Sequence, residues 1–152
     1  MNKLIEFESN LEQLIDFAKK LANKTKVGDI FLLSGNLGVG KTTFAKALIN
    51  SLFDIHNITR PENIKSPSFP IMVNYPLRDC EIYHYDFYRI KKKTELTEIG
   101  IFEELEKNIS IIEWPNILLN NFRLKNYYLL EFQIIDLNTR LLKIFHTTKN
   151  QI

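Results

Sequence analysis

Residues 35–42 read Gly35-Asn36-Leu37-Gly38-Val39-Gly40-Lys41-Thr42 and match the phosphate-binding loop pattern GxxxxGK[ST] at every fixed position. An apolar, strand-like run at residues 29–34 precedes this loop, and apolar residues at helical spacing follow it. A strand, a glycine loop and a helix in this order present backbone N–H groups and a helix N-terminus to a phosphate chain. The flanking elements argue against a chance match by a glycine-rich turn. The stretch therefore predicts a P-loop fold and a nucleotide site.

The loop and the residues after it supply the expected nucleotide contacts. Lys41 would reach the β- and γ-phosphate oxygens, and the Thr42 hydroxyl would hold Mg²⁺. Backbone N–H groups of residues 38–43 would point at the β-phosphate. The full expected binding set is Gly35, Leu37, Gly38, Val39, Gly40, Lys41, Thr42 and Thr43. For the adenine, the segment before the first helix and the C-terminal hairpin are both open as contacts.

Composition fits one compact domain over residues 1–152, with 45% hydrophobic residues. The single cysteine, Cys80, excludes an internal disulfide and indicates a reducing compartment. No apolar run has the length of a signal peptide core or a membrane span, so we expect a cytoplasmic protein without a membrane partner. The net charge is only +2 and no dense basic cluster occurs, which argues against strong direct nucleic-acid binding.

Helical and strand patterns alternate early in the chain, and hairpin patterns dominate later. The expected elements are a helix opened by a capping box at Ser9 and Glu12, with Leu11, Leu14, Ile15, Ala18 and Leu21 as its buried stripe; a strand at 29–34; a helix to about residue 53; a surface loop at 54–67; strands at 69–75 and 81–88; helical residues 94–108 interrupted near Gly100; a strand at 110–113; and strands at 127–135 and 140–146. The pattern predicts an α/β fold. We expect a P-loop NTPase-like mixed sheet flanked by helices, with antiparallel hairpins in the middle and at the C-terminus.

Two carboxylates at predicted strand ends are candidates for the acidic group that a P-loop requires. Glu113 ends the apolar run at residues 109–112, and Asp86 ends the alternating strand Tyr83-His84-Tyr85-Asp86. One would fix Mg²⁺ while the other orders the attacking water, and the sequence leaves open which does which. Both residues also fit ordinary solvated strand ends. With Lys41, they form the expected catalytic set.

Missing motifs narrow the choice of nucleotide and reaction. No Asp stands three residues before any glycine, and Asn-Lys-x-Asp is absent, so the chain lacks the signatures of a GTPase. ATP is therefore the expected nucleotide. The five arginines are scattered singly, which weakens the alternative of a small-molecule kinase with an arginine-bearing lid. A purely structural role of the nucleotide is a third alternative.

Four blocks of this sequence, in order, resemble the motifs of the TsaE (YjeE) family. They are Gly35-Asn36-Leu37-Gly38-Val39-Gly40-Lys41-Thr42-Thr43, similar to G-[DN]-L-G-A-G-K-T-T; Ser66-Pro67-Ser68-Phe69, similar to S-P-T-[FY]; His84-Tyr85-Asp86-Phe87-Tyr88-Arg89, similar to H-x-D-x-Y-R; and Glu95-Leu96 through Gly100 to Glu113-Trp114-Pro115, similar to E-L…G…E-W-P. The departures are a serine at 68 for threonine, Pro70 where the family commonly has threonine, and Val39 for alanine. The resemblance covers nearly the whole chain and weakens after Asn116.

The resemblance implies an ATP- and Mg²⁺-binding protein that hydrolyses ATP weakly alone. It further implies action with the TsaB–TsaD pair, which transfers a threonylcarbamoyl group to a tRNA adenosine, so that tRNA would be reached only through the partners. By the same resemblance, Thr42 and Glu113 would hold Mg²⁺, and Asp86 would assist hydrolysis. Residues 66–69 would act as a switch segment near the γ-phosphate. For His84 we expect packing in the sheet, and the role of Trp114 stays open.

Overall fold

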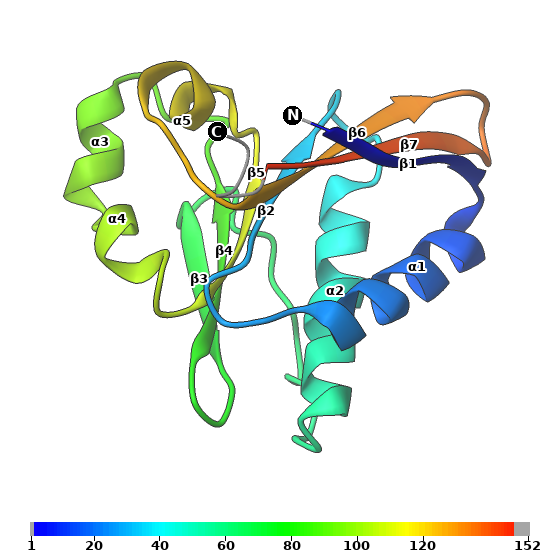
Figure 1. The fold of residues 1–152 in the computed structure, drawn as a ribbon, viewed down its shortest axis with the longest axis horizontal. Coiled ribbons are helices and arrows are strands. Elements are labelled where there is room, and N and C mark those ends of the chain that lie inside the picture. The colour runs from blue at the N-terminus through cyan, green and yellow to red at the C-terminus, as the bar shows by residue number, and fades with distance from the viewer. Residues whose placement is uncertain (1, 148–152) are drawn as a thin grey trace.

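The computed structural model describes residues 2–147. Seven strands form one sheet in the order β1-β7-β6-β2-β5-β4-β3, with helices on both faces (Figure 1). The elements are β1 (Asn2–Ser9), α1 (Leu11–Lys24), β2 (Ile30–Ser34), α2 (Lys41–Ile55), β3 (Met72–Pro76), β4 (Glu81–Asp86), α3 (Lys93–Glu98), α4 (Ile101–Glu104), β5 (Ile109–Glu113), α5 (Asn116–Asn121), β6 (Tyr127–Ile134) and β7 (Arg140–His146). Within residues 2–147, none of the helices combines the length and the apolar character that a bilayer crossing requires.

The strand directions confirm the predicted mixed sheet. Strands β4, β5, β2 and β6 run parallel, whereas β3–β4 and β6–β7 are antiparallel hairpins and β1 lies antiparallel to β7. Leu33 of β2 and Asp86 of β4 are both register partners of Glu113 in β5. Because parallel strands end at the same edge of a sheet, this register places both candidate carboxylates beside the loop that follows β2.

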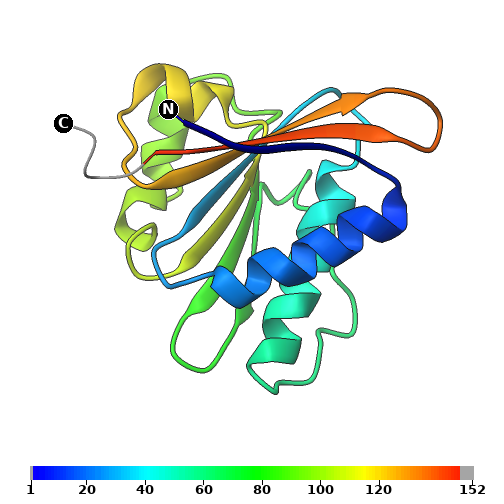
Figure 2. The same cartoon turned by 45° about the vertical axis from the view of Figure 1, so that its right-hand side comes forward.

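Each face of the sheet has its own hydrophobic core. Helices α1 and α2 cover one face, and α3, α4 and α5 lie on the other (Figure 2). Phe31 and Leu33 of β2 belong to the first core and Leu32 to the second, as expected for a central strand buried on both faces. Fully burying an apolar side chain of this size stabilises the fold by roughly 1.5–3 kcal/mol. The central strands that carry the loop and Glu113 are therefore its best-anchored parts.

Helix α1 begins one residue later than the sequence predicted. Its capping box uses Asn10, whose Oδ1 accepts the backbone N–H of Gln13 at 2.8 Å, and Gln13, whose Oε1 accepts the N–H of Asn10 at 2.9 Å. The expected box at Ser9 and Glu12 is wrong because Ser9 is the last residue of β1 and pairs with Arg140. The expected stripe also differs. Leu14 and Ala18 are buried, Ile15 and Leu21 are half-buried, and Leu11 is 59% exposed.

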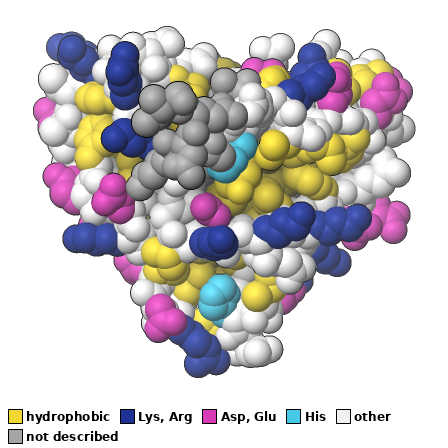
Figure 3. All heavy atoms as spheres, in the orientation of Figure 1, with side chains coloured by type: hydrophobic (Ala, Val, Ile, Leu, Met, Phe, Trp, Pro, Cys, Tyr) yellow, Lys and Arg dark blue, Asp and Glu magenta, His cyan; other side chains and the backbone are white. Residues whose placement is uncertain are grey.

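Strand β1 and helix α5 were not predicted. β1 lies at the sheet edge, where most of its side chains are exposed, so its hydrophobic alternation is weak. Between β1 and α1 lies an open apolar groove of about 460 Å³, visible as a band of hydrophobic side chains in Figure 3.

Strand β3 begins at Met72 and not at residue 69. Phe69 is 80% exposed, Pro70 lacks an N–H, and Ile71 has a left-handed backbone, all of which oppose pairing there.

Candidate nucleotide-binding site

The P-loop connects β2 to α2 in a conformation that depends on glycine. Gly35 has φ +149°, and a Cβ at this position would lie 2.7 Å from the carbonyl oxygen of Phe132 in β6. Gly40 has φ +115° and is the N-cap of α2, where no side chain caps the first turn. The N–H groups at the start of α2 therefore have no capping side chain. Free N–H groups together with the helix dipole form an anion-binding end of the helix.

Lys41 is buried at the mouth of this loop, with 4% of its surface exposed. Its Nζ donates a hydrogen bond to the carbonyl oxygen of Gly35 and lies 3.3 Å from the centroid of the Trp114 ring. Burial lowers the pKa of the Lys41 ammonium, and the negative charges of Glu113 and Asp86 partly oppose this shift. Trp114, which had no assigned role from sequence, therefore covers the loop lysine through a cation–π contact.

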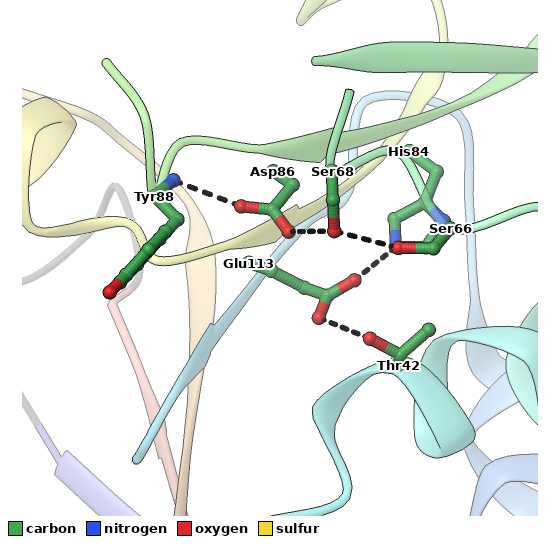
Figure 4. A network of polar contacts seen from close by, with 7 residues as sticks. All are labelled: Thr42, Ser66, Ser68, His84, Asp86, Tyr88 and Glu113. Carbon is green, nitrogen blue, oxygen red and sulfur yellow. Dashed lines mark hydrogen bonds and ion pairs between the residues drawn. The ribbon is translucent and has the colours of Figure 1, made fainter. Parts of the chain in front are cut away.

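Glu113 is brought to Thr42 although the two are 71 residues apart in sequence. The Thr42 hydroxyl donates to Oε1 of Glu113 at 2.7 Å, and Oε2 lies 2.7 Å from Nε2 of His84 (Figure 4). Only 2% of Glu113 is exposed. The hydroxyl at the start of α2 and the carboxylate at the end of β5 form a donor set suited to Mg²⁺. The sequence-predicted metal ligands therefore lie in contact.

Asp86 lies beside Glu113 but has different partners. Its Oδ1 accepts the backbone N–H of Tyr88 at 2.9 Å, and its Oδ2 accepts the Ser68 hydroxyl at 3.2 Å. The Ser66 and Ser68 hydroxyls lie 2.8 Å apart, so the predicted switch segment reaches Asp86 through its serines (Figure 4). The structure thus brings Lys41, Asp86 and Glu113 to one edge of the sheet.

A cavity of about 520 Å³ opens next to the loop, on the side of α1. Its lining comprises Ser9, Asn10, Leu11, Glu12, Leu14, Gly38, Val39, Gly40, Thr43, Leu137, Asn138 and Arg140. The segment before α1 and the C-terminal hairpin, which the sequence left as alternatives for the adenine, both line this one cavity. Arg140 also donates through Nε to the carbonyl oxygen of Val39 at 2.9 Å and so ties the hairpin to the loop. The sequence did not show that these two segments share one cavity, because their proximity depends on the pairing of β1 with β7.

Three other residues of the predicted binding set, Val39, Leu37 and Thr43, lie in environments that differ from one another. The Val39 side chain is buried in the core, and its N–H donates to the carbonyl oxygen of Asn36 at 3.2 Å. Leu37 is 74% exposed. Thr43 is exposed and lines the 520 Å³ cavity. The Val39 side chain therefore points into the core, whereas the Thr43 side chain is available to a ligand.

Comparison with known proteins identifies the family. The family model described as threonylcarbamoyl adenosine biosynthesis protein TsaE matches residues 8–142. The TsaE protein of Rickettsia felis is 38% identical over 90% of this chain and 76% of its own length. The TsaE protein of Borreliella burgdorferi is 34% identical over 87% of this chain and 92% of its own length.

A solved structure shows the same fold. The crystal structure of YdiB from Bacillus subtilis superposes with a TM-score of 0.70 at 21% identity, covering 99% of this chain and 90% of that chain. Together with the sheet order and the glycine loop, this likeness establishes a P-loop NTPase-like fold. The family model and the relatives connect this fold with threonylcarbamoyladenosine biosynthesis. The chain belongs to the TsaE family of threonylcarbamoyl adenosine biosynthesis proteins.

Proposed function

We propose that this chain binds ATP and Mg²⁺ and hydrolyses the ATP in support of threonylcarbamoyladenosine synthesis in tRNA. The observation that carries the proposal is the contact between Thr42, at the start of α2, and the buried Glu113 at the end of β5. It pairs a hydroxyl of the P-loop helix with an acid on a neighbouring strand, as the chemistry of phosphoryl transfer requires.

The residues at the loop fit a magnesium–phosphate group. Residues 2–147 contain no cluster of three or more His, Cys, Asp or Glu side chains that could hold a metal on their own. Mg²⁺ commonly takes one or two protein oxygens and completes its shell with phosphate oxygens and water. Thr42 and Glu113 would supply the protein oxygens, and the uncapped N–H groups of α2 would bind the phosphates. Bound Mg²⁺ supplies charge neutralisation at the phosphate oxygens.

The other two catalytic candidates take separate tasks in this proposal. Lys41 would leave Gly35 and Trp114 and place its ammonium on the phosphate oxygens, exchanging one buried partner for another. Because Glu113 is already engaged with Thr42, Asp86 is the acid that remains to orient a water for attack. The base and ribose would occupy the cavity of about 520 Å³.

We further propose that TsaB and TsaD are the partners and that tRNA is reached only through them. The low net charge of +2 supports indirect contact with tRNA, since a chain that binds tRNA directly would concentrate positive charge on one face. Hydrolysis would be weak alone and stimulated by the partners. We propose a cytoplasmic protein, with residues 1–152 forming a single ATPase domain; the one sheet that joins β1 near the N-terminus to β7 supports a single domain.

One assay tests this function against the alternative of a metabolite kinase. ATP hydrolysis is measured for the chain alone, with purified TsaB and TsaD, and with candidate small-molecule acceptors. We expect stimulation by the protein pair and no phosphorylated metabolite. A phosphorylated small molecule without any effect of TsaB and TsaD would contradict the proposal. Turnover that stays at background with every partner would instead assign the nucleotide a structural role.

A further inference from the structure

His84 is a fully buried polar side chain within strand β4, at 0% exposure. Its register partners are Ile111 on β5 and Val73 on β3, which belong to or pack against the hydrophobic core on the α1–α2 face of the sheet. A polar ring in such a place costs free energy unless it is hydrogen-bonded. Sequence reasoning gave His84 only a packing role, which leaves this cost without compensation.

The hydrogen bonding of the ring is directed entirely at Glu113. Nε2 lies 2.7 Å from Oε2 of Glu113, whereas Nδ1 has no hydrogen-bond partner within residues 2–147. An ionised carboxylate can only accept hydrogen bonds, so Nε2 carries the proton and donates it. Among the described residues, Glu113 is the only group that is hydrogen-bonded to the His84 ring.

Glu113 is consequently held from two sides. Thr42 of α2 donates to Oε1, and His84 of β4 donates to Oε2 (Figure 4). The buried Lys41 ammonium interacts electrostatically with the same carboxylate. Without a donor at Oε2, the carboxylate would be free to turn toward this ammonium. The contact from β4 opposes that rotation.

We propose that His84 is the positioning residue of Glu113, whose Nε2–H fixes Oε2 and thereby keeps Oε1 at Thr42 for Mg²⁺. The inference deepens the proposed function and rests on its assignment of Thr42 and Glu113 to the metal. His84 itself touches neither nucleotide nor metal in this arrangement. Its effect is on the orientation of the ligand and hence on metal affinity and turnover.

A matched pair of substitutions separates positioning from core filling. In His84→Gln the amide nitrogen reaches about as far from the backbone as Nε2 and keeps a donor for Glu113. In His84→Asn the amide is one methylene shorter and corresponds to Nδ1, so it does not reach the carboxylate. Ile111→Val, on the neighbouring strand and the same face, is the control for general loosening of this core.

Three readouts apply to each variant: thermal unfolding, kcat and KM for ATP in the presence of TsaB and TsaD, and binding of a non-hydrolysable ATP analogue as a function of Mg²⁺ concentration. We expect His84→Asn to lower kcat by about 10- to 100-fold, the loss that corresponds to one hydrogen bond to a buried charged group. The Mg²⁺ concentration for half-maximal analogue binding should rise by a similar factor. KM at saturating Mg²⁺ should stay unchanged. His84→Gln should stay within about 3-fold of the wild type in both quantities, as a retained donor predicts.

Equal kcat and equal Mg²⁺ dependence of analogue binding in His84→Gln and His84→Asn would overturn the inference. The inference is also overturned if Ile111→Val, at the same loss of thermal stability, lowers kcat as much as His84→Asn does. Analogue binding of the wild type that does not depend on Mg²⁺ overturns it as well. A wild type that never hydrolyses ATP, but whose Mg²⁺-dependent analogue binding still separates Gln from Asn, refutes the proposed hydrolysis and leaves the positioning role standing.

Discussion

Asp86 and Glu113, the two carboxylates at the P-loop edge of the sheet, are neighbours in register but are held by different parts of the molecule. Glu113 is held by His84 on strand β4 and by Thr42 on helix α2, both regular elements. Asp86 is held by the Ser68 hydroxyl and the Tyr88 N–H, which both belong to connecting segments. Glu113, the proposed metal ligand, is therefore held by regular elements, whereas Asp86, the proposed water-positioning acid, is held by segments that are free to adapt.

The loop next to Asp86 also exposes groups that a partner can reach. Phe69 is 80% exposed and its ring lies 4.2 Å from the Arg89 guanidinium carbon, while Tyr88 is 58% exposed. A partner that moved residues 66–69 would change the contacts of Asp86 without moving Glu113. We therefore expect the proposed stimulation by partners to act through Asp86 and residues 66–69.

The largest effect is expected from Glu113→Ala. Loss of the carboxylate removes the proposed metal ligand and leaves Thr42 and the buried His84 without their acceptor, so kcat should fall by about 100- to 1,000-fold. The unfolding free energy should also decrease by about 1–3 kcal/mol, because His84 stays buried without a partner. Steady-state hydrolysis and denaturant unfolding measure the two effects. Wild-type turnover in Glu113→Ala would refute the role assigned to this residue.

Asp86→Asn should give a smaller loss that is confined to turnover. The amide oxygen can still accept the Tyr88 N–H, so stability should change little, but the neutral group orients water poorly and kcat should fall by about 100-fold. The affinity for the ATP analogue with Mg²⁺ should stay at the wild-type value. This is measured by calorimetric titration beside the hydrolysis assay. A loss of Mg²⁺-dependent affinity equal to that of Glu113→Ala would abolish the distinction between the two carboxylates.

Sequence reasoning anticipated those parts of the site that a short motif encodes. The loop that ends at Lys41 and Thr42 is local, and Glu113 could be placed because an apolar strand ending in an acid is a local pattern as well. The same holds for the two hairpins, since their turns lie between clear strand patterns.

The parts that were missed depend on pairing between distant segments. The contact of His84 with Glu113 follows from the parallel register of β4 and β5, which no local pattern encodes. Strand β1 is an exposed edge, and its pairing with β7 shifted the capping box from Ser9 to Asn10. Trp114 lies over Lys41 and has a left-handed backbone at φ +56°, a conformation that composition does not indicate.

The smallest effect is expected from Ser68→Ala. The hydroxyl contact with Asp86 is 3.2 Å long, so its loss should lower partner-stimulated kcat by about 2- to 10-fold. Ser68→Thr, which keeps the hydroxyl and restores the residue usual in the family motif, is the control and should retain full activity. Hydrolysis with and without TsaB and TsaD is the measurement. An equal effect of both substitutions would show that the hydroxyl does not support Asp86.

The division of labour between the two acids is tested most directly by a crystal structure of this chain with a non-hydrolysable ATP analogue and Mg²⁺. We expect Mg²⁺ at the Thr42 hydroxyl and Glu113, with His84 Nε2 still bonded to Oε2 and Asp86 facing the water beside the γ-phosphate. Mg²⁺ held by Asp86, with Glu113 turned away from Thr42, would contradict it.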